Sequence, residues 1–386
     1  MALKFREATN LSSGTSHDDA CDALCGCAPR GQPLSRRSFL CSAAAAGLGG
    51  ALSASPAQAQ AADVKMGAGT IDVHHHYFPP ATQEATFKML TGVFGDVPER
   101  IRNWSPARAL EELDRNGVAK AIISTSARPR IDNLTPEQIR VQARASNQYG
   151  ARMVQDYPKR FAQFGFLPMP DVEATLQEIE YVFDVLKAPG VGMMTSYGDL
   201  WQGNPVFDPV LQELHRRKAV IFCHPLPAQC CTALMPRIAP REALFLEFPY
   251  DTGRAVVSLL MSGSFVKYRD IRWIFCHCGG PVPALAGRIR NAMSEMSPEV
   301  VARMAPNGLD YELRRQYYDT ADAAYGPTMA AIMNYIPKSQ ILFGTDYPFL
   351  RVQTNAKEIT DRGLSAEDML ALQRGNVTAL MPQLAN

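Results

Sequence analysis

Short apolar runs rich in β-forming residues alternate with longer amphipathic stretches from about Thr70 onward. The longer stretches, such as Pro106–Asn116 and Asp171–Leu186, place their apolar residues on one helical face. This alternation is typical of a parallel sheet, because a parallel crossover usually needs a helix. Eight such units predict a closed (β/α)8 barrel, with strands over Thr70–His76, Val118–Thr125, Phe161–Pro168, Gly190–Thr195, Ala219–His224, Ile271–His277, Gln316–Thr320 and Gln340–Asp346.

The pattern indicates one barrel domain over residues 62–386, since no internal repeat or low-complexity tract interrupts it. The stretch from Tyr77 to Ser105 is long for a strand-to-helix connection. We therefore expect an insertion after the first strand.

The first 61 residues have the features of an export signal. Ser35-Arg36-Arg37-Ser38-Phe39-Leu40 is a twin-arginine pattern, and the weakly apolar run that follows it to about Leu52 is too short for a membrane span. Small residues at Ala59 and Ala61 suit cleavage by a signal peptidase. We predict a twin-arginine signal peptide over 1–61 and a periplasmic protein; the alternative is a disordered, arginine-containing tail.

The charge balance is almost neutral, with 39 Lys+Arg against 38 Asp+Glu. Such a balance gives no field that would attract nucleic acid or an anionic membrane, so the expected partner is a small molecule. Nine cysteines form no evident disulfide framework, because four lie in the first 61 residues and five remain. Cys223 and Cys276 lie in apolar runs and are expected to be buried thiols, whereas the redox state of Cys230 and Cys231 stays open.

Metal-binding side chains close several of the predicted strands. His74 and His76 end the first run, His224 the fifth, His277 the sixth and Asp346 the eighth. The carboxyl ends of barrel strands meet on one face, where active sites of such barrels form. These five groups are therefore expected to converge.

His74 and His76 point to the same side of a strand and His75 to the other, so the pair can chelate one ion. His224 ends an apolar run, and Asp346 ends another. Both side chains are costly to bury without a cation or other partners. Each alone could be an ordinary core or loop residue; together, three histidines and one aspartate suit a single Zn²⁺, or Mn²⁺, with an open position for water or substrate.

His277 lies in Phe275-Cys276-His277-Cys278-Gly279-Gly280. It could be a further metal ligand. A catalytic imidazole that exchanges a proton beside the metal is the interpretation that we favour.

The motifs as a set resemble those of the amidohydrolase superfamily, in its branch that contains aminocarboxymuconate-semialdehyde decarboxylase. Four of them carry this resemblance: Ile71–His76, Cys223-His224-Pro225, His277–Gly280 and Phe343–Pro348. Within the branch, Glu247–Ala255 is similar to the 6-methylsalicylate decarboxylases.

The resemblance implies roles for individual residues. It implies metal ligands at His74, His76, His224 and Asp346, and a catalytic histidine at His277. It implies that Arg288 enters the neighbouring subunit's site to hold a carboxylate, which makes the protein a homodimer or larger homo-oligomer, and that Arg102 is a second carboxylate-binding residue. Cys278 departs from the family, which usually has Ala or Gly after the catalytic histidine.

Three functions follow as hypotheses. The first is metal-dependent, non-oxidative decarboxylation of an aromatic acid of the 2-hydroxybenzoate type, such as 6-methylsalicylate, or of a related conjugated carboxylic acid, with Asp346 or a water activated by His277 protonating the ring carbon. The second is hydrolysis of an ester, lactone or amide by a metal-activated water, with Asp346 moving the proton. The third, a non-catalytic metal- or ligand-binding protein, leaves the proton-transfer groups His277 and Asp346 without a purpose.

Overall fold

The computed structural model describes residues 65–125, 134–226 and 243–385. They fall within one compact unit, bounded at Ala61 and Asn386. The expected signal peptide over 1–61 and the adjacent Cys230 and Cys231 lie outside the described residues.

Eight parallel strands form the barrel, in the order β1-β2-β3-β4-β7-β8-β9-β10. The two ends of this order meet, because Val73 N donates to Phe343 O at 3.0 Å and His76 N donates to Tyr347 O at 2.6 Å. The predicted (β/α)8 barrel is confirmed, with strands β1 Thr70–His76, β2 Val118–Ser124, β3 Phe161–Phe166, β4 Gly190–Met194, β7 Val220–His224, β8 Arg272–Phe275, β9 Tyr317–Asp319 and β10 Ile341–Leu342.

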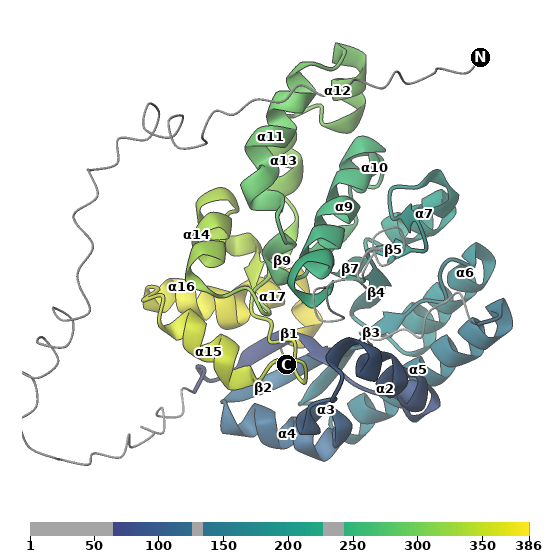
Figure 1. The fold of residues 1–386 in the computed structure, drawn as a ribbon, viewed down its shortest axis with the longest axis vertical. Coiled ribbons are helices and arrows are strands. Elements are labelled where there is room, and N and C mark those ends of the chain that lie inside the picture. Colours follow the sequence, from purple (N-terminus) through teal and green to yellow (C-terminus); the bar gives the residue numbers. More distant parts are fainter. Residues whose placement is uncertain (1–64, 126–133, 227–242, 386) are drawn as a thin grey trace, which may run out of the picture. The chain divides into compact units, whose positions relative to one another are not determined.

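Helices surround the strands (Figure 1). Between β1 and β2 the chain forms α2 (Pro80–Phe94), α3 (Glu99–Arg102) and α4 (Pro106–Arg115), and a short hairpin of β5 (Ser196–Tyr197) and β6 (Leu200–Trp201) follows β4. The other helices are α5 Pro136–Asp156, α6 Val172–Glu180, α7 Asp208–Arg216, α9 Phe248–Met261, α10 Ser264–Lys267, α11 Val282–Ser294, α12 Pro298–Met304, α13 Leu309–Arg314, α14 Gly326–Tyr335, α15 Val352–Thr360, α16 Ala366–Leu370 and α17 Asn376–Leu380. Shorter 3₁₀ and π turns are η2 Tyr181–Val185, η3 Pro205–Phe207, η5 Ala243–Glu247, η6 His277–Gly279, η7 Lys338–Gln340, η8 Ala371–Gly375 and η9 Pro382–Leu384.

Six of the eight strand predictions were too long at their carboxyl ends, and two of these six end at site residues. β8 ends at Phe275 rather than His277, and β10 ends at Leu342 rather than Asp346. Both His277 and Asp346 have a left-handed backbone, with φ of 56° and 61°, which a strand does not allow. The chain therefore turns where it delivers these two polar side chains.

An apolar floor lies beneath the carboxyl ends of the strands. The rings of Phe164 on β3 and Phe222 on β7 stack with centroids 5.2 Å apart, and the ring of His74 contacts Phe222 at 4.9 Å. Phe222 and His224 are two residues apart on one strand and so share a face. A polar cluster above this floor is shielded from water on one side.

Cys223 and Cys276 are free and buried, as expected, and so is Cys278. Across the described ranges, we find no helix with the length and apolar character needed to traverse a bilayer.

Candidate metal centre

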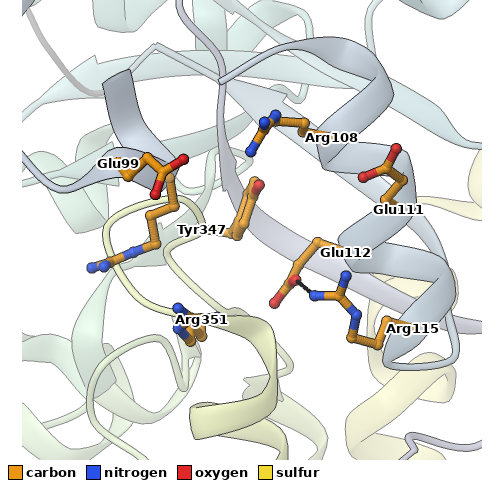
Figure 2. A pocket seen from close by; sticks show the side chains of 8 residues that line it. Glu99, Arg108, Glu111, Glu112, Arg115, Tyr347 and Arg351 are labelled. Carbon is orange, nitrogen blue, oxygen red and sulfur yellow. Dashed lines mark hydrogen bonds and ion pairs between the residues drawn. The ribbon is translucent and has the colours of Figure 1, made fainter. Parts of the chain in front are cut away.

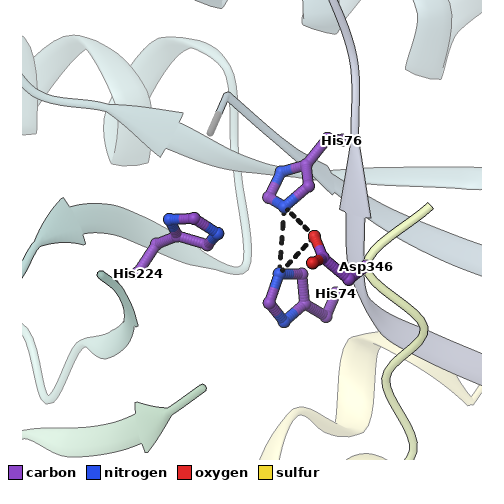
Figure 3. Close-up of side chains that lie close together, drawn as sticks. All are labelled: His74, His76, His224 and Asp346. Carbon is purple, nitrogen blue, oxygen red and sulfur yellow. Dashed lines mark hydrogen bonds and ion pairs between the residues drawn. The ribbon is translucent and has the colours of Figure 1, made fainter. Parts of the chain in front are cut away.

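The structure brings together four of the side chains that were predicted to meet. His74 and His76 come from β1, His224 ends β7 and Asp346 follows β10 (Figure 3). One nitrogen or oxygen atom from each lies within 4.8 Å of the other three, and all four residues are buried. The Nε2 atoms of His74 and His76 are 2.9 Å apart, and Asp346 Oδ1 lies 2.8 Å from the Nε2 of His76.

Each of the three imidazoles is oriented through its other nitrogen. The Nδ1 atoms of His76 and His224 lie 3.2 and 3.0 Å from backbone carbonyls, which only accept hydrogen bonds. The Nδ1 of His74 lies 2.9 Å from a carboxylate oxygen of Asp319. The protons therefore sit on Nδ1, and the Nε2 lone pairs turn toward the centre of the cluster.

These atoms fit a divalent cation. Three imidazole lone pairs and a carboxylate face one another in a buried space, an arrangement that repels itself without positive charge. Asp346 Oδ1 is buried and accepts no well-formed hydrogen bond from the described residues. Atoms that bind one Zn²⁺ tetrahedrally at about 2.1 Å lie about 3.4 Å apart, close to the 3.3 Å between Asp346 Oδ1 and His74 Nε2.

The electrostatics of the cluster agree with this assignment. Burial holds the pKa of His224 well below its ordinary value, and the neighbouring imidazoles add to that effect, so His224 is neutral. Burial opposes ionisation of Asp346, but His74 and His76 outweigh it and lower its pKa far below the usual range. Burial alone would also lower the pKa of His74, yet Asp319 and Asp346 raise it to about 10. A proton held there would be displaced by a bound cation.

Asp319, at the end of β9, was not among the residues singled out from the sequence. Its carboxylate accepts hydrogen bonds from the backbone amides of His277 and Ala321, each at 3.0 Å, besides its contact with His74. It is the last residue but one of the seventh predicted run, much as Asp346 ends the eighth, and that signal could have identified it. Asp319 joins the cluster to His277.

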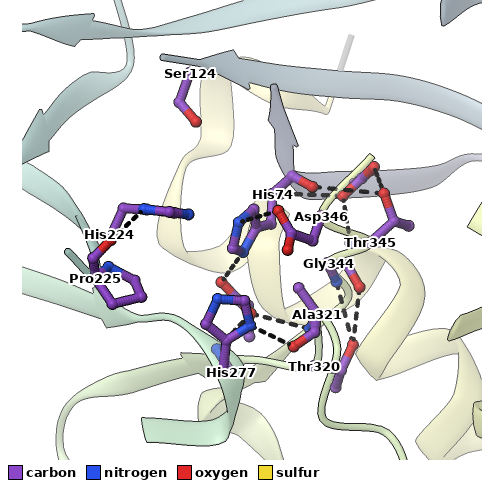
Figure 4. Close-up of polar contacts among 12 residues, drawn as sticks. His74, Ser124, His224, Pro225, His277, Thr320, Ala321, Gly344, Thr345 and Asp346 are labelled. Carbon is purple, nitrogen blue, oxygen red and sulfur yellow. Dashed lines mark hydrogen bonds and ion pairs between the residues drawn. The ribbon is translucent and has the colours of Figure 1, made fainter. Parts of the chain in front are cut away.

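His277 lies beside the four-residue cluster. Its Nδ1 is 2.8 Å from Ala321 O, so this nitrogen donates and Nε2 is left as the acceptor (Figure 4). Its ring centroid is 5.1 Å from that of His74 and 6.0 Å from that of His224. Among the described residues it groups with His74 and Asp319, and not with the set that holds His76, His224 and Asp346. This placement suits an imidazole that exchanges protons next to the cluster.

The turn after His277 depends on glycine. Cys278 also has a left-handed backbone, with φ of 55°, and Gly279 and Gly280 follow with φ of 75° and 58°. A Cβ on Gly280 would lie 2.2 Å from Pro249 O, so no other residue fits. The Gly-Gly pair therefore lets the chain turn directly after the histidine.

A second buried carboxylate, Asp72, joins β1 to the segment that carries Asp346. It accepts hydrogen bonds from the backbone amides of His74 at 3.0 Å and Thr345 at 3.1 Å, and from the Thr345 hydroxyl at 2.6 Å. His75 contacts Asp72 through Nδ1 at 3.0 Å and stacks on the Tyr347 ring, which places it outside the cluster, as strand alternation predicts. Asp72 thus fixes the position of both chain segments.

Asp251 on α9 supports the chain segment around His224. It is fully buried and accepts hydrogen bonds from the hydroxyls of Thr195 and Ser196 and from the indole of Trp201. The Thr195 hydroxyl in turn accepts from the amide of Leu226 at 3.0 Å, while Thr195 N donates to the carbonyl of His224. Hydrogen bonds to Thr195 therefore fix the backbone at His224 and at Leu226.

The two arginines named from the sequence do not reach the cluster within this chain. Arg102 is exposed and forms an ion pair with Asp96 at 2.6 Å. Arg288 is exposed on α11. Arg100 instead lies nearer the site, because its guanidinium donates to the carbonyls of Pro348 and Phe349 just beyond Asp346.

Known proteins are similar to this chain in sequence and in fold. The amidohydrolase family model (Amidohydro_2) matches residues 71–380. The 6-methylsalicylic acid decarboxylase acuB of Aspergillus aculeatus is 33% identical over 72% of this chain and 84% of its own. The 6-methylsalicylic acid decarboxylase of Penicillium expansum is 31% identical over 72% of this chain and 84% of its own. The crystal structure of a dihydroxybenzoic acid decarboxylase from Polaromonas sp. JS666, with bound manganese and the inhibitor 2-nitroresorcinol, superposes with a TM-score of 0.70 at 24% identity, over 82% of this chain and 97% of that one.

Proposed function

Because the chain belongs to the amidohydrolase family, we propose that it is a metal-dependent, non-oxidative decarboxylase of an aromatic acid of the 2-hydroxybenzoate type. The observation that carries the proposal is the four-residue cluster with the separately anchored His277 beside it. The similarity to two 6-methylsalicylic acid decarboxylases makes 6-methylsalicylate the first substrate to test. The hydrolase hypothesis is not favoured, since relatives that match most of this chain are named decarboxylases.

The reaction consumes one proton: the ring carbon that bears the carboxylate gains a proton, the bond to the carboxyl carbon breaks, and CO₂ leaves. A metal ion held by His74, His76, His224 and Asp346 would bind and polarise the substrate's oxygens. His277, anchored through Nδ1 on Ala321 O, presents Nε2 as the group that takes up and delivers a proton. The stacked rings of Phe164 and Phe222 keep water from the base of the site.

The metal is Zn²⁺ in this proposal, because three imidazoles and one carboxylate form a common zinc ligand set. Mn²⁺ is the alternative, supported by the manganese in the Polaromonas structure. Loading the metal-free protein with each ion and comparing CO₂ release at equal metal content decides between them. Higher turnover with Mn²⁺ would contradict the zinc assignment.

The proposal extends to the assembly and to export. Arg288 is exposed on α11 and serves a neighbouring subunit in a homodimer, where it holds the substrate carboxylate, whereas Arg102 would have to leave Asp96 to take part. The twin-arginine motif at Arg36-Arg37 directs the protein to the periplasm. Sedimentation of the purified protein tests the dimer, and fractionation of cells that express the chain with Arg36 and Arg37 replaced by lysine tests the export.

The activity test follows CO₂ from the metal-loaded protein incubated with 6-methylsalicylate and other 2-hydroxybenzoates. We expect His277→Ala to lower the rate by about 10²–10⁴-fold, as for the loss of a general acid–base group, with metal content unchanged. His215→Ala is the matched control, because His215 is a partly exposed histidine on α7. Absence of CO₂ from a protein that holds one metal per chain would overturn the proposal, and loss of metal in His277→Ala would make His277 a ligand.

A further inference from the structure

A second polar cavity lies outside the metal centre, between α3, α4 and the segment that links β10 to α15 (Figure 2). Its volume is about 250 Å³, and no residue of the four-residue cluster lines it. The lining consists of four arginines, three glutamates and one tyrosine: Arg100, Arg108, Arg115, Arg351, Glu99, Glu111, Glu112 and Tyr347. The arginines thus exceed the glutamates by one charge.

Two of the three glutamates are already engaged by neighbours on their own helices. Glu112 forms an ion pair with Arg115 at 3.0 Å, which Figure 2 shows on one side of the cavity. Glu99 accepts a hydrogen bond from the Asn103 amide at 3.1 Å. The pairing of Glu112 with Arg115 leaves three arginines facing two glutamates, so the lining keeps an excess of one positive charge.

The guanidinium groups of Arg108 and Arg351, both exposed residues, form no hydrogen bond or ion pair within the described part of the chain. Arg100 uses its guanidinium on the carbonyls of Pro348 and Phe349. Burial lowers the pKa of Arg100, and the positive charge of Arg351 lowers it further, which places these two guanidinium groups close to each other. Guanidinium groups that outnumber the carboxylates around them can form a site for an anion.

Tyr347 supplies a hydroxyl that points toward Arg108 (Figure 2). The residue is 5% exposed, and its side chain lies between Arg108 and Arg351 in the cavity. The residue lines the cavity, where its hydroxyl is available to a ligand as a hydrogen-bond donor. Burial, and next the charge of Glu112, raise the pKa of Tyr347 to about 12, so the hydroxyl remains a donor at neutral pH.

We propose that this cavity is a binding site for a small oxyanion, a carboxylate or a phosphate, held by Arg108, Arg351 and the hydroxyl of Tyr347. Planar guanidinium groups match the oxygens of both anion types with paired N–H donors. The phenol hydroxyl can donate one further hydrogen bond to the anion. The anion would neutralise the excess positive charge of the lining and satisfy the hydroxyl. No contribution from the metal centre is needed.

The site lies directly behind the segment that carries Asp346. Tyr347 is its chain neighbour, and the ring of Phe349 contacts that of His76 at 5.4 Å. Arg100, from the cavity wall, holds the carbonyl of Pro348 at 2.7 Å. Anion binding is nevertheless independent of the proposed reaction, so it is measured without turnover.

The test measures the rate of chemical modification of each arginine separately. The full-length, metal-loaded protein is treated with phenylglyoxal, which modifies free guanidinium groups, and the modification of Arg108, Arg351 and Arg303 is followed by peptide mass spectrometry. Arg303 is the control, an exposed arginine on α12 without an ion pair to a described residue. At a concentration of inorganic phosphate or benzoate about four times its Kd, the modification of Arg108 and Arg351 should slow about fivefold, while that of Arg303 stays constant.

A variant makes the test specific. In Arg108→Gln, the anion concentration that half-protects Arg351 should rise at least about tenfold, since one charge-assisted hydrogen bond is lost. Arg303→Gln should leave that concentration unchanged. The anion that protects at the lower concentration identifies the site as carboxylate- or phosphate-binding. Equal modification with and without both anions, equal protection of Arg303, or unchanged half-protection in Arg108→Gln would each overturn the proposal.

Discussion

Replacing Asp319 by asparagine tests whether a carboxylate behind the ligands controls the metal centre. Asp319 Oδ1 accepts from the amides of His277 and Ala321, and Oδ2 faces Nδ1 of His74 at 2.9 Å. An asparagine can keep its oxygen toward the two amides and then turns its NH₂ toward His74. Because an amide nitrogen only donates, the imidazole proton must move to Nε2, the atom that faces the metal.

The structure limits the effect to one interaction, because the two backbone hydrogen bonds of Asp319 survive in the variant. Loss of an outer carboxylate on a metal-binding histidine typically weakens the metal by 10–100-fold, or about 1.4–2.7 kcal/mol. We expect a weakening in this range for Asp319→Asn. At saturating metal, decarboxylation should fall less than metal binding, because the hydrogen bond that positions the amide of His277 survives.

Competition with a chromogenic chelator at pH 7 measures the metal Kd, and thermal unfolding of the metal-free protein checks that the variant folds. Asp361→Asn is the control, since Asp361 is an exposed residue on the far end of α15 that pairs only with Lys357, at 2.5 Å. If Asp319→Asn binds metal within about twofold of the wild type while folded, the tautomer argument is wrong.

Three further changes have expected outcomes. Gly344→Ala would place a Cβ 2.9 Å from that of His74, so we expect metal loss by elemental analysis with the barrel's far-ultraviolet circular dichroism retained. Asp251→Asn replaces an acceptor of two hydroxyls and an indole N–H, which should lower the free energy of unfolding by about 1–3 kcal/mol in urea titrations. Arg216 holds the pKa of Glu213 at about 2, so Glu213→Gln should destabilise the protein above about pH 4.5, and the difference from wild type should shrink as the pH falls toward 2.

The alternation of apolar runs and amphipathic stretches was sufficient to predict the barrel, because every strand is buried and every crossover is helical. It also predicted which strand ends would meet, since His74, His76, His224 and Asp346 lie where the parallel strands end. Asp319 lay within reach of the same reasoning, near the end of the seventh run.

Other parts of the site could not be predicted from local pattern. Asp72 contacts Thr345, more than 270 positions away in the chain, and only the closure of the barrel brings the two together. The choice between Arg100 and Arg102 depends on which side of the short α3 faces the segment after Asp346, and a four-residue helix has too few residues to show a face.

The left-handed residues His277 and Asp346 show why these buried carboxylates matter. A non-glycine residue in this conformation costs about 1–3 kcal/mol and persists only when its surroundings hold it there. Asp319 holds the amide of His277, and Asp72 holds Thr345, whose neighbour Asp346 donates its own amide to His74 O at 2.8 Å. Each strained turn is thus fixed by a carboxylate that lies behind it. The imidazole of His277 and the carboxylate of Asp346 consequently keep their positions without depending on a metal.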